Sequence, residues 1–127
     1  MNCKNCSLFI LRLLIAVIFF YHGIGKVLNP SGAMQFFSSI GLPGFLGAIV
    51  GWVEVIGAVL LFLGLFTKWA NYALMIVILG ALVLVQIKGA VAAGKLTPDL
   101  ERDLLIFAGT LVISAFGAGK WALQKTE

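Results

Sequence analysis

The most constraining feature of this sequence is a series of four long apolar stretches, each close to the length of a membrane-spanning helix. A helix needs roughly 20 residues to cross a hydrocarbon layer of about 30 Å. The stretches cover residues 7–28, 45–66, 69–88 and 100–119. The fourth is short between its charged ends, so we expect it to begin near Leu100. The sequence therefore predicts an all-α integral membrane protein, a four-helix antiparallel bundle forming one domain over residues 1–127.

Composition supports this prediction and excludes several classes of protein. The chain has 127 residues, of which 61% are hydrophobic and 11% charged, whereas soluble domains carry about 25% charged residues. A soluble enzyme or a disordered linker is therefore a poor interpretation. The nine Lys and Arg residues are scattered singly and form no stripe that would follow phosphates, so we expect a lipid bilayer and no nucleic acid as partner.

The first apolar stretch is expected to be a retained span and not a cleaved signal peptide. Arg12 interrupts its apolar part, and no small-residue cleavage site follows. Residues 29–32 predict a helix stop and a turn.

The connections between the stretches are short. Residues 33–40 predict a short helix lying in the membrane interface, with Phe36, Phe37 and Ile40 in the lipid boundary. Residues 64–68 predict a turn into the third stretch, and residues 89–98 a connection to the fourth, where Thr97 supplies a helix cap.

Orientation follows from the basic residues on each face of the membrane. An even number of spans places both termini on one face, which holds five basic residues: Lys4, Arg12, Lys68, Lys120 and Lys125. The opposite face holds four: Lys26, Lys88, Lys95 and Arg102. The positive-inside rule then predicts cytoplasmic termini in the cell (plasma) membrane.

Ionisable residues inside the spans are the candidates for function, because such a group at mid-membrane costs about 3 kcal/mol on insertion scales. At helical spacing, Arg12, His22 and Lys26 share one face of the first stretch with Ile15 and Phe19. We expect this face to point into the bundle. Arg12, at the far end, is expected to reach the headgroups or to meet Asn71.

The second stretch carries a matching face. Gly47, Gly51, Glu54 and Ala58 share it, and small residues four apart allow close approach of helices. Glu54 is thus expected at a helix contact near mid-span. Lys26 would pair there with Glu54 or with Glu101.

Depth along an antiparallel bundle brings further polar groups together. His22 and Lys26 fall in the same leaflet as Gln86, Glu101 and Asp103. Two interpretations remain open: a polar network that only fixes packing, or a site of ligand binding and proton exchange, for which histidine beside carboxylates is well adapted near neutral pH.

Cys3 and Cys6 form a C-x-x-C pair near the N-terminus. No second Cys or His pair completes a zinc site, which needs about four ligands, and we expect no metal. The pair is a redox-active dithiol, a metal ligand between subunits, or a tail without a role.

Several motifs together resemble those of the DoxX family of small four-span membrane proteins, over nearly the whole chain. They are Leu11-Arg12-Leu13, His22-Gly23-x-x-Lys26-Val27, Phe36-Phe37 with Gly41-Leu42-Pro43, Glu54-x-x-Gly57, Leu63-Gly64-Leu65-Phe66-Thr67-Lys68, Glu101, and Gly117-Ala118-Gly119-Lys120-Trp121. Ala118 stands where the family usually has proline, a change expected to loosen the helix end without touching a polar group. The C-x-x-C pair is not part of the family pattern.

The resemblance implies a four-helix membrane bundle and, more loosely, a link to membrane oxidoreductase complexes or to thiol and oxidative-stress defence. We expect a subunit of a quinone-linked oxidoreductase. His22, Lys26, Glu54 and Glu101 would be its catalytic residues, and His22, Lys26 and Gln86 would contact the quinone. No haem, flavin or dinucleotide motif is visible, so electrons would come from other oxidoreductase subunits. The alternatives are a non-enzymatic assembly factor or scaffold, or a small transporter that would form a homo-oligomer.

Overall fold

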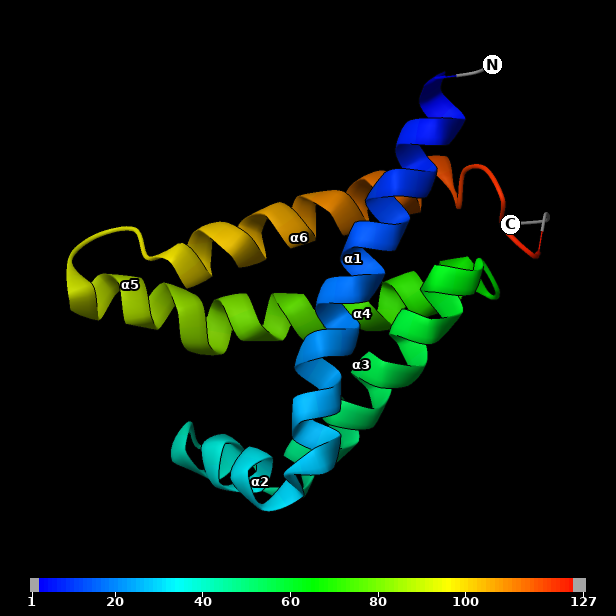
Figure 1. Ribbon diagram of the computed structural model, residues 1–127. Helices are drawn as coiled ribbons and strands as arrows, with labels where there is room; N and C mark the ends of the chain where they lie inside the picture. The colour runs from blue at the N-terminus through cyan, green and yellow to red at the C-terminus, as the bar shows by residue number, and fades with distance from the viewer. Residues whose placement is uncertain (1–2, 125–127) are drawn as a thin grey trace.

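The computed structural model describes residues 3–124, which form helices and connecting segments without strands. The elements are α1 (Cys3–Leu28), α2 (Pro30–Ser39), α3 (Phe45–Leu63), α4 (Thr67–Ala81), the π-helix η1 (Leu82–Gln86), α5 (Ile87–Ala93) and α6 (Pro98–Phe116) (Figure 1). The all-helical prediction is confirmed. Lys125, which entered the orientation argument, lies outside the described residues.

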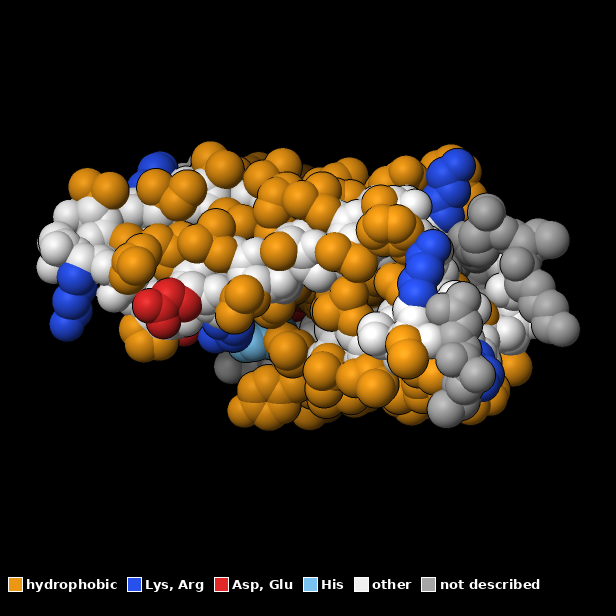
Figure 2. Space-filling view, turned by 90° about the horizontal axis from the view of Figure 1, so that it is seen from above, with side chains coloured by type: hydrophobic (Ala, Val, Ile, Leu, Met, Phe, Trp, Pro, Cys, Tyr) orange, Lys and Arg blue, Asp and Glu red, His pale blue; other side chains and the backbone are white. Residues whose placement is uncertain are grey.

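Three helices are long and apolar enough to cross a membrane. They are Cys3–Leu28, Phe45–Leu63 and the continuous helix Thr67–Ala93. Their outward faces carry large apolar side chains such as Ile76 and Val91, which are 71% and 76% exposed, and apolar groups dominate the surface in Figure 2. In water such a surface would drive aggregation, so the spans imply a lipid environment. The helix α6 does not meet the same criterion, because charged residues occupy its first turns.

The helices form two antiparallel pairs that meet at one end and diverge at the other (Figure 1). α1 packs along α3, and α4 packs along α6. The first turn of α1 and the segment after α6 meet at the closed end of this V, which we call the termini end. The core between the pairs is apolar and contains Ile15, Phe19, Leu61, Leu74, Ile106 and Ile113.

Small residues bring α1 and α3 into backbone contact, as the sequence predicts. A Cβ atom added at Gly23 would lie 2.7 Å from Cβ of Glu54, and one at Gly51 would lie 2.7 Å from Cβ of Lys26. A Cβ at Gly47 would meet the carbonyl oxygen of Ala33 in α2 at 2.6 Å. Since lipid gives little hydrophobic reason for helices to associate, this close packing is a main source of stability in the bundle.

The chain between α1 and α3 is more helical than expected. The predicted turn at residues 29–32 was wrong, because Asn29 alone separates the two helices. The Asn29 side chain accepts a hydrogen bond from the Gly32 amide at 3.2 Å and so caps α2, while Pro30 occupies the first helical position. The short helix therefore begins three residues before the predicted position 33.

The third span is also longer than predicted. The connection expected over residues 89–98 is helical as far as Ala93, because Val91, Ala92 and Ala93 continue the helix to a left-handed Gly94. Thr97 caps α6 by accepting from the Leu100 amide at 3.2 Å, as expected. At its other end α6 stops at Phe116, before the predicted residue 119, because Gly117 turns the chain at a φ of 85°.

The C-terminal segment after α6 folds back over the closed end of the V. There Arg12 is fully buried and donates from Nη1 to the Ala118 carbonyl at 3.0 Å, and from Nη2 to the Lys120 and Trp121 carbonyls at 3.4 Å. Two expectations were wrong: Arg12 neither reaches the headgroups nor meets Asn71, and Ala118 does touch a polar group. Asn71 instead donates to the Thr110 carbonyl at 2.9 Å and to Ser114.

Two glycines in α1, two residues apart, test the close packing. Gly23→Ala should lower the free energy of unfolding by about 1–3 kcal/mol, because its Cβ would collide with Glu54 and the Val55 backbone. Gly25→Ala should be neutral or slightly stabilising, because nothing lies within 4 Å of its added Cβ. Reversible unfolding in detergent measures both, and equal losses would contradict the packing argument.

Candidate functional site

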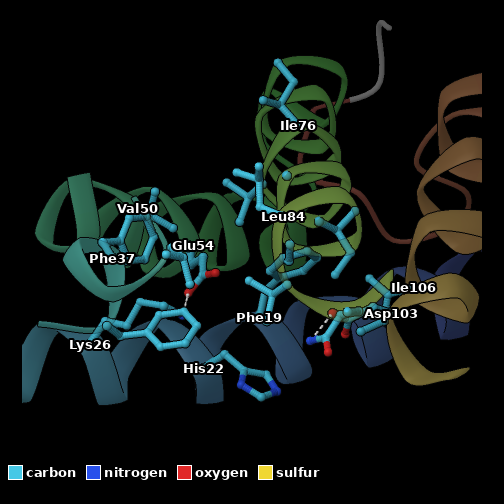
Figure 3. A pocket seen from close by; sticks show the side chains of 18 of the residues that line it. Phe19, His22, Lys26, Phe37, Val50, Glu54, Ile76, Leu84, Asp103 and Ile106 are labelled. Carbon is cyan, nitrogen blue, oxygen red and sulfur yellow. Dashed lines mark hydrogen bonds and ion pairs between the residues drawn. The ribbon is translucent and has the colours of Figure 1, made fainter. Parts of the chain in front are cut away.

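A cavity of about 360 Å³ lies where the two helix pairs diverge. One wall comes from α1, α2 and α3, and the other from α4, η1 and α6. Most lining side chains are apolar, while six polar ones gather in the same cavity: His22, Lys26, Glu54, Gln86, Arg102 and Asp103. Figure 3 shows Val50 near Glu54 and Leu84 further into the cavity, with Ile76 farthest from the labelled polar side chains.

Lys26 and Glu54 form an ion pair between α1 and α3. Lys26 Nζ donates to Glu54 Oε2 at 2.8 Å, with the two side chains 26% and 6% exposed. Of the two partners predicted for Lys26, the structure selects Glu54. The pair can form because Gly23 and Gly51 hold the two backbones close on either side of it.

A second charged group comes from α6 and the π-helix. Asp103 is 3% exposed and accepts from Gln86 Nε2 at 3.0 Å and from Arg102 Nε at 2.9 Å. Arg102 also donates to Asp99 at 3.1 Å. Since both oxygens of this carboxylate receive hydrogen bonds, Asp103 is held in place as a buried anion.

His22 lines the same cavity and is half-buried. In the view of Figure 3 its imidazole extends away from the Lys26–Glu54 pair, on the side nearer Asp103. The ring edge of Tyr21 contacts it, with ring centroids 5.6 Å apart. Its imidazole thus belongs to a group of two cations, two carboxylates and an amide.

The short helix α2, predicted to lie in the membrane interface, also lines the cavity. Phe36 is 46% exposed, whereas Phe37 and Ile40 are half-buried, and all three line the cavity. The interfacial expectation for this helix therefore missed its second role. Close contact between Gly47 and Ala33 fixes α2 against α3 and so sets the position of these side chains.

The structure brings together most, but not all, of the residues singled out from the sequence. His22, Lys26, Glu54 and Gln86 meet in the cavity, whereas Glu101 is exposed on α6 and does not line it. Asp103, two positions further along, takes the place expected for Glu101. Arg102 also lines the cavity, although its sequence position indicated only a basic residue at one membrane face.

The π-helix η1 is the other feature that sequence analysis missed. Ile87 N donates to the Leu82 carbonyl, five residues earlier, and this widened turn carries Leu84, Val85 and Gln86 on the cavity wall. Such bulges occur often at functional sites. The apolar sequence of this turn contained no signal for it.

Comparison with known proteins identifies the family of this chain. The DoxX family model matches residues 7–87. The chain belongs to the DoxX family. Its DoxX relatives include a Bacillus subtilis protein named "Putative oxidoreductase CatD", 39% identical over 91% of this chain and 82% of the relative.

Two further DoxX relatives are named only as membrane proteins. The "Uncharacterized membrane protein Rv3486" of Mycobacterium tuberculosis is 30% identical over 94% of this chain and 80% of its own length. The "Inner membrane protein YqjF" of Escherichia coli is 23% identical over 96% and 92%. No solved structure matches the chain.

Two carboxylates test whether the buried pair in this DoxX protein is structural. Glu54→Gln should lower the free energy of unfolding by about 1–3 kcal/mol, because it leaves the Lys26 ammonium without a counter-charge. Glu101→Gln should change it by less than about 0.5 kcal/mol, because this side chain is exposed and forms no ion pair with any residue from 3 to 124. Unfolding of both variants in the same detergent measures the difference, and equal stability would show that the pair adds nothing to folding.

Proposed function

We propose that this DoxX protein is a membrane subunit of an oxidoreductase and that its cavity binds a quinone. The observation that carries the proposal is an apolar cavity of about 360 Å³ that ends on a compact group of hydrogen-bonding side chains. A quinone has the matching form, an apolar ring and tail with two carbonyl oxygens. The name of the Bacillus relative supports an oxidoreductase assignment.

Charge balance in the cavity favours a ligand with a neutral headgroup. Lys26 is bonded to Glu54, and Arg102 to Asp103, so the four charges cancel. A charged ligand would have to compete with one of these pairs in a region of low dielectric. A carbonyl oxygen can instead accept a hydrogen bond from a second N–H of Lys26 or from His22 while both pairs stay intact.

The apolar lining fits the remainder of such a molecule. Phe37, Leu46 and Val50 form one wall, and Ile76 and Leu84 the other. Ile76 is 71% exposed, so the cavity reaches the lipid-facing surface between the two helix pairs. A prenyl tail would leave the protein there and enter the bilayer directly.

In this proposal each polar residue has a distinct task. A bound quinone supplies the capacity to take up two electrons and two protons. Lys26 donates a hydrogen bond to one carbonyl oxygen, and His22 exchanges a proton at a ring nitrogen. Glu54 and Asp103 hold Lys26 and Arg102 in position. Glu101 would act only as an exposed proton acceptor in the first turn of α6. The electrons would come from another oxidoreductase subunit.

Filling the cavity tests the binding proposal. Leu84→Trp places an indole in the cavity and should weaken binding of short-chain benzoquinone or naphthoquinone analogues by about tenfold or more. Leu79→Trp is the matched control, because Leu79 lies on the same helix, is 45% exposed and does not line the cavity. Calorimetric titration of the protein in nanodiscs measures binding. Failure of both analogues to bind the natural protein would overturn the proposal.

The substitution His22→Ala distinguishes a proton-transfer role of His22 from a purely structural role. If His22 relays protons, quinone-linked electron transfer in membranes should fall by about tenfold or more at an unchanged folded yield. If folded yield falls instead and activity per folded protein is kept, the polar group serves packing, and an assembly factor becomes the better assignment. A change in neither quantity would remove His22 from the site.

We further infer that α6 is a fourth span and that both termini are cytoplasmic in the plasma membrane. The support is geometric: the segment after α6 returns to the start of α1, where Lys120 N donates to the Asn5 carbonyl at 3.1 Å. With three spans before it, α6 must cross the bilayer to bring its end there. Its charged first turns then lie at the opposite face, beside the mouth of the cavity.

The native cysteines test this orientation. In intact cells, Cys3 should be protected from a membrane-impermeant maleimide and should react after permeabilisation, because it lies at the termini end of α1. A Lys95→Cys substitution in a variant without Cys3 and Cys6 should show the opposite pattern, because Lys95 is exposed between α5 and α6. Labelling of Cys3 in intact cells would reverse the inferred orientation.

A further inference from the structure

Two thiols lie in the first turns of α1, at the end of the molecule away from the cavity. Cys3 is exposed, Cys6 is half-buried, and both are free. At 1.5 Å per helical residue, about 24 Å separate Cys6 from His22. The DoxX match begins at residue 7 and does not include the pair. These cysteines are therefore separate from the proposed quinone site and from the family pattern.

We propose that Cys3 and Cys6 form a reversible dithiol–disulfide pair that reacts with small anionic disulfides of the glutathione class. Residues three apart on a helix lie on one face, with Cβ atoms about 5–6 Å apart. A disulfide needs about 3.5–4.5 Å between its Cβ atoms. Closing the bond therefore requires the turn to tighten by only about 1–2 Å.

Of the two cysteines, only Cys3 is placed so that it can move to tighten this turn. Cys3 is the first described residue of α1; Ser7 Oγ donates to its carbonyl at 2.9 Å, while its side chain is exposed and not packed in place. The next turn is held, because the Asn5 carbonyl accepts from Lys120 N at 3.1 Å and because a Cβ at Gly119 would lie 2.6 Å from Cβ of Leu8. Cys3 can thus move toward Cys6 while the rest of α1 stays in place.

Exposure assigns different tasks to the two sulfurs. The exposed Cys3 thiolate attacks one sulfur of the small disulfide, which forms a mixed disulfide and releases one thiol. The half-buried Cys6 then attacks the Cys3 sulfur, which breaks the mixed disulfide and releases the second thiol. The protein loses two electrons and two protons, and the small disulfide gains both to become two thiols.

The charges at this end favour an anionic reactant. Among residues 3–124 the acidic side chains are Glu54, Asp99, Glu101 and Asp103, in the middle of α3 and the first turns of α6. The termini end carries Lys4, Arg12, Lys68 and Lys120. Figure 2 shows basic groups at both ends of one face, whereas the acidic groups of that face lie at one end only. A positive field of this kind raises the local concentration of anions such as glutathione disulfide.

Redox titration of the whole protein in nanodiscs tests the proposal. The reduced protein is incubated in glutathione buffers of increasing disulfide fraction, quenched with acid and labelled with a mass-shifting maleimide. Both thiols should disappear together as an intramolecular disulfide. If the two thiols are modified independently at equal rates, or if only disulfide-linked dimers form, the proposed intramolecular pair is wrong.

Single-cysteine variants test the assigned tasks. Cys6→Ser should accumulate one mixed disulfide at Cys3, and Cys3→Ser should react at least about tenfold more slowly. Both variants should unfold over the same range of denaturant concentration as the natural protein. A difference in reaction rate would then not come from a folding defect. Equal rates in the two variants would contradict the order of attack.

Salt dependence tests the class of reactant. Added salt should slow oxidation by glutathione disulfide several-fold, because it screens the basic end. It should leave oxidation by neutral hydroxyethyl disulfide nearly unchanged. The same salt effect on both reagents would contradict selection of an anion. None of these measurements depends on quinone binding, so this proposal and the proposed function fail or succeed separately.

Discussion

An ion pair can persist inside a membrane bundle only where the protein itself supplies the surroundings that water would otherwise provide. The Lys26–Glu54 pair meets this condition because Gly23 and Gly51 bring α1 and α3 into backbone contact around it. The same contact holds α1 and α3 together as one of the two helix pairs of the V. It also places a charged group on the cavity wall, near the end of α1 that leads into α2 and away from the closed end of the V. Packing, polarity and the position of the cavity therefore depend on one helix interface.

The closed end of the V depends on a different kind of bond. Arg12 is a buried cation held by main-chain carbonyls of the C-terminal segment. That segment is joined to the end of α3 by hydrogen bonds from its backbone N–H groups to the Leu63 and Gly64 carbonyls. Carbonyl dipoles stabilise the guanidinium without a carboxylate, so this end keeps its positive charge. Since the other end balances cations with carboxylates, the molecule has one basic end and one neutral end. This asymmetry supports both the inferred orientation and the preference of each site for its ligand.

Sequence patterns predicted the features that repeat along a helix. The face carrying Arg12, Ile15 and Phe19, the face carrying Gly51 and Glu54, and the Thr97 cap follow from local spacing, and each appears in the structure. Features that depend on contacts between distant segments were missed. Arg12 meets carbonyls more than a hundred positions away, and the choice of Asp103 over Glu101 depends on the rotation of α6 against α4. Two acids separated by one residue point about 160° apart on a helix, so only one of them can face the cavity, and the rotation of α6 decides which. The π-helix was missed because its apolar residues fit an ordinary helix equally well.

That widened turn also explains how one wall of the cavity can be both apolar and polar. Through η1, the helix that presents Ile76 and Leu84 to the cavity also directs Gln86 toward Asp103. Gln86 donates one amide hydrogen to Asp103, and Arg102 satisfies the other oxygen of that carboxylate. The amide oxygen of Gln86 is not used in this bond and can accept a hydrogen bond. A ligand headgroup that alternates between accepting and donating, as a quinone and its reduced form do, would find donors on the α1 side and an acceptor on the η1 side. The two helix pairs would then contribute complementary halves of one site, which a single pair could not form.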